Sequence, residues 1–291
     1  MPSLRATATL LMLLGSPSAS ASYWVGEFTG SAENYRIERA GEEILLQQLM
    51  LLQTGDTVHI DDAGAELVVI NERNERIALT NKVSPFVVPE SAAAPSLLVN
   101  VGNWIESWWA TRAKQSSTTL VAVSKGLFDP AALVAVQGEN LLLPGRREIF
   151  IAWTGGSSPF DVKLTTPSGE IIAQVTHITE YDVTLPQRNF DSGQRIELQI
   201  TDGMGHSVVP ITVVDENQLP VSARAIIELE VPDAIRFGSL ALILSGFENW
   251  RFEALQVARV YKLRDLEHSL LNQAYPQFDE AELERALGDN E

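Results

Sequence analysis

The segment Glu148-Ile149-Phe150-Ile151-Ala152-Trp153 is the clearest strand signal in the chain. β-branched and aromatic residues favour strands, and successive strand side chains point to opposite faces. Similar short segments follow at 160–164, 171–173, 181–185, 195–200 and 208–214. Glycine-rich turns lie between them, and short strands with turns about every 8–12 residues are typical of an antiparallel sandwich. We therefore predict a β-sandwich over residues 144–216, with Trp153 buried between its sheets.

One hairpin of this unit resembles a known kind of domain. The sequence Gln199-Ile200-Thr201-Asp202-Gly203-Met204-Gly205-His206-Ser207-Val208 is similar to the last hairpin of bacterial extracellular immunoglobulin-like domains. The resemblance implies an immunoglobulin-like sandwich. Since the chain has no Cys, the sandwich has no disulfide and is not of the antibody type.

A second β-rich unit precedes the sandwich. Period-two patterning and turns predict a small β-barrel or sandwich over residues 22–90, with strands at 35–39, 57–60, 66–70 and 76–79. Ile37-Glu38-Arg39, then Leu52-Gln53-Thr54-Gly55-Asp56-Thr57-Val58, a small-residue turn and two strands resemble the periplasmic FecR-type domain. In that family such modules bind proteins or sense envelope states, and they are not catalytic.

Residues 91–143 are predicted to be a linker that carries one amphipathic helix. Its apolar positions fall at helical spacing, and Trp109 stands beside them: Leu97, Val101, Trp104, Ile105 and Trp108. The aromatic face could pack on a neighbouring domain, form an exposed site for a protein partner, or lie on a membrane surface. Trp104, Trp108 and Trp109 are therefore candidate partner-binding residues.

Residues 217–291 are predicted to form a helical C-terminal subdomain. Helices are expected after Pro220 and after Pro232-Asp233, and a last short helix over 279–287. Two apolar stripes follow helical spacing: Trp250, Ala254, Val257, Ala258 and Tyr261, then Leu266, Leu270 and Ala274. These paired helices resemble a tetratricopeptide-type hairpin. The first stripe needs a covering surface, either internal or a partner protein for which Trp250 and Tyr261 would be anchors.

The first 21 residues have the pattern of an export signal. Arg5 precedes the apolar run Ala6–Leu14, and Ala19-Ser20-Ala21 is a small-x-small cleavage site. The alternative is a membrane anchor, but this run is too short to cross a bilayer of about 30 Å. We predict cleavage after Ala21 and a periplasmic or secreted protein of a Gram-negative bacterium, with no integral membrane segment in the mature chain.

Composition narrows the classes of function. The 291 residues include 38 acidic and 21 basic side chains, a formal charge of −17, so nucleic acid is not an expected partner. A chain without Cys has no thiol catalysis and no cysteine zinc site. The amount of apolar sequence, 45%, is typical of folded domains.

No catalytic, cofactor-binding or metal-binding residue is predicted. The four histidines, His59, His177, His206 and His268, lack metal-binding spacing, and there is no G-x-S-x-G motif. Four aspartates lie in predicted turns: Asp61, Asp62, Asp202 and Asp215. They could bind calcium, but the preference of aspartate for turns explains their positions better.

The sequence therefore predicts a non-enzymatic envelope protein that acts in protein–protein interaction, sensing or assembly. One alternative is a carbohydrate- or peptidoglycan-binding module that stacks sugars on exposed tryptophans. A second is a hydrolase with a carboxylate pair that no motif reveals. Burial of the tryptophans separates the first two possibilities, and a carboxylate pair converging in a deep pocket would indicate the third.

Overall fold

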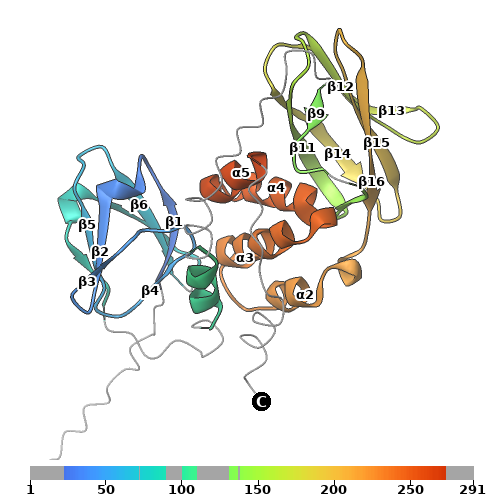
Figure 1. Ribbon diagram of the computed structural model, residues 1–291. Helices are drawn as coiled ribbons and strands as arrows, with labels where there is room; N and C mark the ends of the chain where they lie inside the picture. The colour runs from blue at the N-terminus through green and yellow to red at the C-terminus, as the bar shows by residue number, and fades with distance from the viewer. Residues whose placement is uncertain (1–22, 72, 90–99, 110–130, 137, 273–291) are drawn as a thin grey trace, which may run out of the picture.

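The computed structural model describes residues 23–71, 73–89, 100–109, 131–136 and 138–272. The predicted class, mainly β with a helical C-terminal region, is confirmed. Figure 1 shows an N-terminal β module on one side, a sandwich on the other and the C-terminal helices between them. The predicted export signal and the predicted helix over 279–287 lie outside the described residues.

The N-terminal module packs two four-stranded sheets face to face. Their orders are β4-β1-β6-β7 and β3-β2-β5-β8, so the module is a sandwich and not a closed barrel. Its strands are β1 (Tyr23–Phe28), β2 (Tyr35–Arg39), β3 (Glu42–Ile44), β4 (Leu51–Leu52), β5 (Thr57–Ile60), β6 (Glu66–Asn71), β7 (Arg76–Thr80) and β8 (Phe86–Val87). Alternate residues such as Ile37, Val58 and Val69 fill the space between the sheets.

The sandwich has a five-stranded sheet, β10-β16-β15-β12-β13, and a three-stranded sheet, β14-β11-β9. Its strands are β9 (Ala132–Leu133), β10 (Asn140–Leu142), β11 (Gly145–Thr154), β12 (Phe160–Thr165), β13 (Ile171–Ile178), β14 (Asp182–Phe190), β15 (Arg195–Thr201) and β16 (His206–Val213). The sandwich begins before residue 144, its predicted start. β10 belongs to it because it pairs in parallel with the last strand, β16, and β9 belongs to it because it pairs with β11. Trp153 is 2% exposed, as predicted, and its ring meets that of Phe160 edge-on at 5.1 Å.

The C-terminal helices are α2 (Val221–Ile227), α3 (Asp233–Gly246), α4 (Arg251–Val260) and α5 (Arg264–Leu271). Pro220 and Pro232 stand directly before α2 and α3, where a missing backbone N–H costs no helical hydrogen bond. α3 is buried without interruption from Gly238 to Ser245, which makes it the central helix of the group. None of the described helices is both long and apolar enough to cross a membrane.

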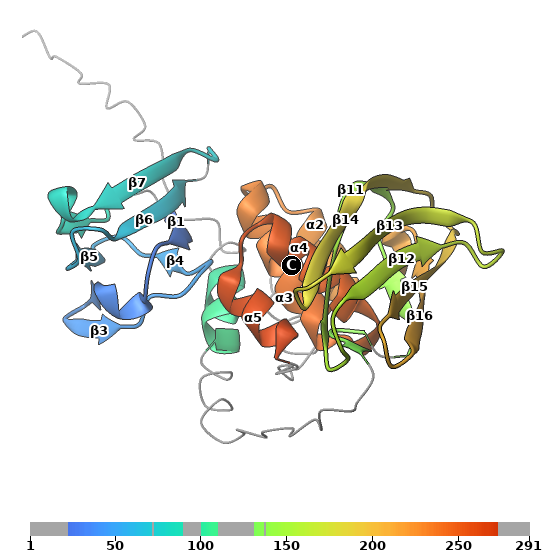
Figure 2. The same ribbon diagram turned by 90° about the horizontal axis from the view of Figure 1, so that it is seen from above.

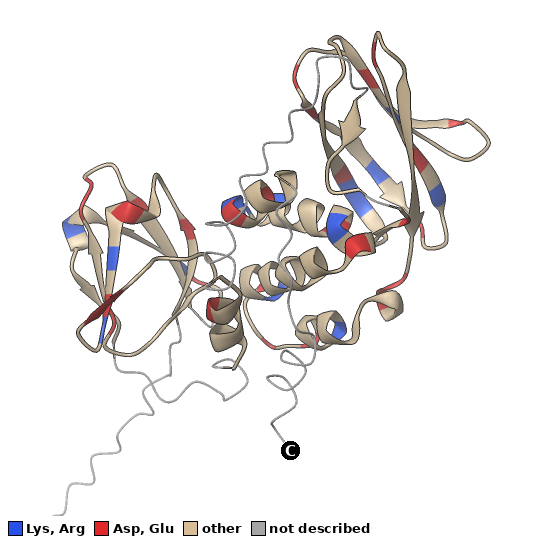
Figure 3. Cartoon of the chain, viewed as in Figure 1, with Lys and Arg blue, Asp and Glu red and all other residues tan. Residues whose placement is uncertain are grey.

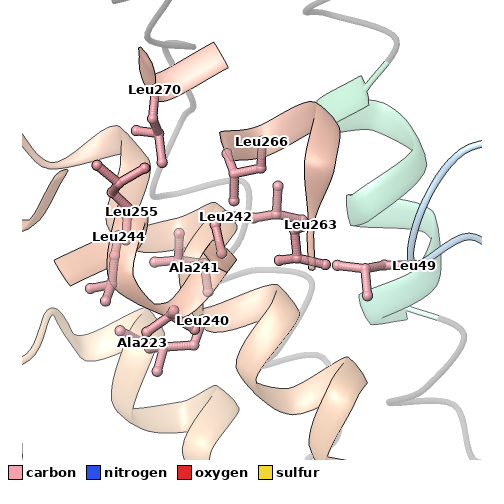
Figure 4. Close-up of a cluster of buried hydrophobic side chains, with 14 of the residues drawn as sticks. Leu49, Ala223, Leu240, Ala241, Leu242, Leu244, Leu255, Leu263, Leu266 and Leu270 are labelled. Carbon is pink, nitrogen blue, oxygen red and sulfur yellow. The ribbon is translucent and has the colours of Figure 1, made fainter. Parts of the chain in front are cut away.

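A single apolar core joins all three parts of the molecule. The helix at residues 100–109 packs with α2–α5, and both β modules add side chains to the same core. Figure 2 shows the helices between the two β modules, and Figure 4 shows Leu49 reaching Leu263 from the N-terminal module. The C-terminal stripe thus finds its covering surface within the chain.

Each β module uses both faces of a sheet. In β11, Ile149, Ile151 and Trp153 point into the sandwich, while Phe150 and Ala152 point into the helical core. In the N-terminal module, Trp24 and Leu51 are cross-strand partners that belong to the helical core. Their neighbours Val25 and Leu52 belong to the core of the module itself. Burial on both faces explains why these strands are apolar at successive positions.

Candidate functional site

The structure buries the four tryptophans that the sequence analysis proposed as partner-binding residues. Trp104, Trp108, Trp109 and Trp250 are between 2% and 7% exposed and lie in the helical core. The indole N–H of Trp109 donates to the backbone oxygen of Gln48 at 3.1 Å, which ties the helix to the N-terminal module. A sugar-stacking platform needs an exposed ring face, so these four residues are structural and do not form one.

Tyr261 is the remaining proposed residue, and it does reach the surface. It follows the last residue of α4, is half-buried, and stacks on Phe237 with ring centroids 5.1 Å apart. Burial raises the pKa of its phenol and nearby Asp233 raises it further, although Arg236 acts in the opposite direction. The phenol is therefore neutral at physiological pH and can both donate and accept a hydrogen bond.

Tyr261 lines a cleft of about 350 Å³ between the N-terminal module and the turn that joins α4 to α5. Lys262 lies in this turn with a φ of +54°. Its backbone carbonyl accepts a hydrogen bond from the side-chain amide of Gln48 at 3.1 Å, which links the turn to the N-terminal module. The lining residues come from β1, the 45–50 loop, β6, β7, α3, the end of α4 and the α4–α5 turn: Gly26, Glu27, Leu49, Ile70, Arg76, Ala234, Val260, Tyr261, Lys262 and Leu263.

One carboxylate organises the charges in this cleft. Glu27 of β1 forms ion pairs with Arg76 of β7 and with Lys262, whose Nζ lies 3.5 Å from its Oε2. Partial burial raises the pKa of Glu27, but hydrogen bonds and charge attraction from Arg76 and Lys262 outweigh burial and leave that pKa below its usual range. Two cations and one anion line the cleft, so its local net charge is positive, whereas the net charge of the chain is negative. Figure 3 shows charged residues on all three parts.

An exposed aliphatic residue completes the rim. Val260 is 70% exposed at the end of α4 and is followed directly by Tyr261. An exposed valine, a stacked aromatic ring and a rim of charged groups can bind a partner through apolar contact and hydrogen bonds. The arrangement holds no nucleophile paired with a base.

The described residues hold no group of three or more His, Asp or Glu side chains placed to bind a metal ion. Two of the four turn aspartates use their carboxylates on the turn backbone. Asp62 accepts from the N–H of Gly64, and Asp202 accepts from the N–H groups of Met204 and Gly205. Asp202 also accepts from the N–H of Ser157, in the loop before β12. Burial opposes ionisation of Asp202, yet these hydrogen bonds hold its pKa below the usual range.

Sequence analysis missed Glu27, Arg76 and Lys262. Glu27 and Lys262 are 235 positions apart, and no local pattern connects them. The one signal was the apolar stripe that ends at Tyr261, which made Tyr261 a candidate anchor for a partner protein. The cleft forms only because the N-terminal module docks on the helices.

Comparisons with known proteins do not assign this chain to a family. No family model matches the chain, and no curated protein matches it. A solved structure with some similarity is that of domains 4 and 5 of the S-layer protein SbsC, at 9% identity and a TM-score of 0.22. The match covers 62% of this chain and 99% of the S-layer structure.

Proposed function

We propose that this protein is an exported, non-enzymatic protein of the bacterial envelope that binds a protein partner at the cleft beside Tyr261. Its role is interaction, sensing or assembly. In this proposal the helical core holds the two β modules at a fixed spacing and presents the α4–α5 turn between them. The resemblance of the N-terminal module to FecR-type domains and of the sandwich to extracellular immunoglobulin-like domains supports this assignment.

The observation that carries the proposal is the pairing of Val260 and Tyr261 on a rigid turn. Val257 and Ala258, in the last turn of α4 before them, are buried in the shared core, so the start of the α4–α5 turn is fixed by the helix. Energetically important residues of protein interfaces are commonly aromatic side chains that are already ordered before binding. Tyr261 meets this condition because it is stacked on Phe237.

A matched set of surface variants tests the proposal. Val260→Glu and Tyr261→Ala are expected to lower capture of the partner from envelope extract at least tenfold, since both remove apolar contact at the rim. Val221→Glu is the control, because Val221 is 57% exposed on α2 and does not line the cleft. All three variants should keep the circular dichroism spectrum of the parent. Equal capture by parent and both cleft variants would refute the cleft as the binding site.

The export part of the proposal has a separate test. The intact mass of protein recovered from the periplasm or medium should correspond to a chain that begins at Ser22. A species that still carries residues 1–21 would contradict cleavage after Ala21.

A further inference from the structure

Strand β11 has one edge that is only partly paired. On one side, β14 pairs with β11 from Gly145 to Ala152. On the other side, β9 pairs only with Trp153 and Thr154, and Val134 donates to the carbonyl of Ala152. Within the described part of the chain, no strand pairs with residues 145–151 along this second edge. The backbone N–H and C=O of Phe150 point out of the sheet at this edge.

The side chain of Gln256 takes the place of the missing strand. Its Oε1 accepts from the Phe150 N–H at 2.9 Å, and its Nε2 donates to the Phe150 carbonyl at 3.0 Å. A primary amide presents the same donor and acceptor as a peptide group, so one side chain satisfies both groups of Phe150. Gln256 is itself 3% exposed, which makes these hydrogen bonds costly to lose.

A carboxylate one turn earlier on α4 binds the segment that leads into β11. Glu253 accepts from the Leu143 N–H at 3.3 Å, and both of its oxygens lie 2.9 Å from Nη1 of Arg147. Glu253 is 1% exposed, so it is a buried charge with a specific partner. Glu253 and Gln256 lie three residues apart on one face of α4.

Two further residues of α4 fix the helix against the strand. Phe252 is 1% exposed and belongs to the core of the sandwich, not to the helical core. The guanidinium of Arg259 lies 3.9 Å from the centre of the Phe150 ring. Four side chains of α4 are therefore committed to β11 or its sandwich: Phe252, Glu253, Gln256 and Arg259.

We infer that α4 is an edge cover, which keeps a second copy of this chain from adding a strand to β11. An unpaired strand edge is a template for pairing with another chain. Within the unpaired stretch, Ile149-Phe150-Ile151 carries no charge, proline or glycine, and its β-branched and aromatic residues favour strand pairing. The cover thus acts through hydrogen bonds that compete directly with such pairing.

The test uses the full mature chain carrying Gln256→Ala, with Gln256→Glu as a second variant. The glutamate keeps the volume and the acceptor but loses the donor to the Phe150 carbonyl. Gln199→Ala on β15 is the control. Hydrogen exchange of the Phe150 amide is expected to rise at least tenfold in Gln256→Ala and less in Gln256→Glu, with β15 and β16 unchanged. Sedimentation velocity should then show a concentration-dependent dimer.

A photo-crosslinking residue in place of exposed Glu148 identifies the surface used by the dimer. Cross-links between two copies within residues 145–152 would support pairing through β11. Unchanged exchange at Phe150 would overturn the edge cover, as would an equal rise across the whole molecule. A variant with an open edge that stays monomeric, or that cross-links elsewhere, would overturn pairing with a second copy.

Discussion

The two β modules are attached to the helices by different combinations of contacts. At the N-terminal module, Leu49 is 1% exposed and packs on Gly238 of α3, where an added Cβ would lie 2.7 Å from its methyl carbons. Leu51 packs in the same way on Gly102, with 2.8 Å to its Cβ. At the sandwich, the contact is made by Gln256 and Glu253, which bind backbone groups and Arg147. The first junction adds close packing against two glycines to the hydrogen bonds of Gln48 with Trp109 and Lys262. At the second, two side chains of α4 bind the backbone and Arg147 of one strand region directly.

The difference shows two ways to fix a neighbouring domain. Close packing against glycine is sensitive to volume, because an added methyl group has no free space. Hydrogen bonds to one strand position are sensitive to register, because a shift by one residue leaves a buried amide unpaired. Both junctions also contain apolar contact, so neither module is free of the helical core.

The largest expected effect comes from the two faces of β11. Trp153→Ala opens the sandwich core, and Phe150→Ala opens the helical core, and each should lower the free energy of unfolding by about 3–5 kcal/mol. Both side chains are nearly fully buried. Chemical denaturation of the mature protein measures both. A loss below about 1 kcal/mol at Phe150 alone would mean that the sandwich contributes little to the shared core.

The next effect concerns the N-terminal junction. Leu49→Ala removes the side chain that packs on Gly238 and should cost about 2–5 kcal/mol. Leu45→Ala is the matched control: Leu45 is 59% exposed, so a change within about 0.5 kcal/mol is expected. If both variants had equal stability, the packing of Leu49 would not hold this module in place.

A smaller effect is expected at the polar junction. Removing one member of a fully buried ion pair costs about 3–5 kcal/mol, and the partial exposure of Arg147 reduces the value expected for Glu253→Ala to about 2–3 kcal/mol. Glu267→Gln is the control, because its partner Arg259 is about half exposed. Thermal melts should rank the two variants in this order, and the reverse order would contradict a structural role for Glu253.

The smallest effect depends on pH and lies in the sandwich far from both junctions. The pKa of Asp202 in the folded protein is below its usual value of about 3.9, so its hydrogen bonds stabilise the fold above that pH. This contribution is lost as the pH falls through the folded-state pKa. Asp202→Asn should therefore flatten the fall in stability between about pH 5 and pH 3. Exposed Asp182→Asn is the control, and an unchanged slope in Asp202→Asn would contradict this role.

Local periodicity was enough to predict most of the strands and helices. Alternation along 148–153 correctly indicated a strand with Trp153 inside, and the stripe from Trp250 to Tyr261 correctly indicated an amphipathic helix. Such patterns report which faces are apolar, but they do not say what covers them. The tryptophans of residues 100–109 were therefore compatible with core, partner or membrane until the structure placed them in the core.

The contacts between the parts could not be predicted in this way. Gln256 and Phe150 are 106 positions apart, and a glutamine in a helix gives no sign that it binds a strand. Leu49 has a φ of +64°, unusual for leucine, and is held there by its packing on α3. The cleft beside Tyr261 depends on this docking, so its charged residues carried no local signal.

The measurement that tests the shared core most directly is equilibrium unfolding followed separately in each part. The chain has no Cys, so single-cysteine labels at exposed Ala63, Ser192 and Arg264 report on the N-terminal module, the sandwich and the helices. If the three parts share one core, the three labels should show the same denaturant midpoint, because unfolding of any part exposes apolar side chains of the other two. A label that reports a separate, earlier transition would contradict the shared core and show which part folds independently.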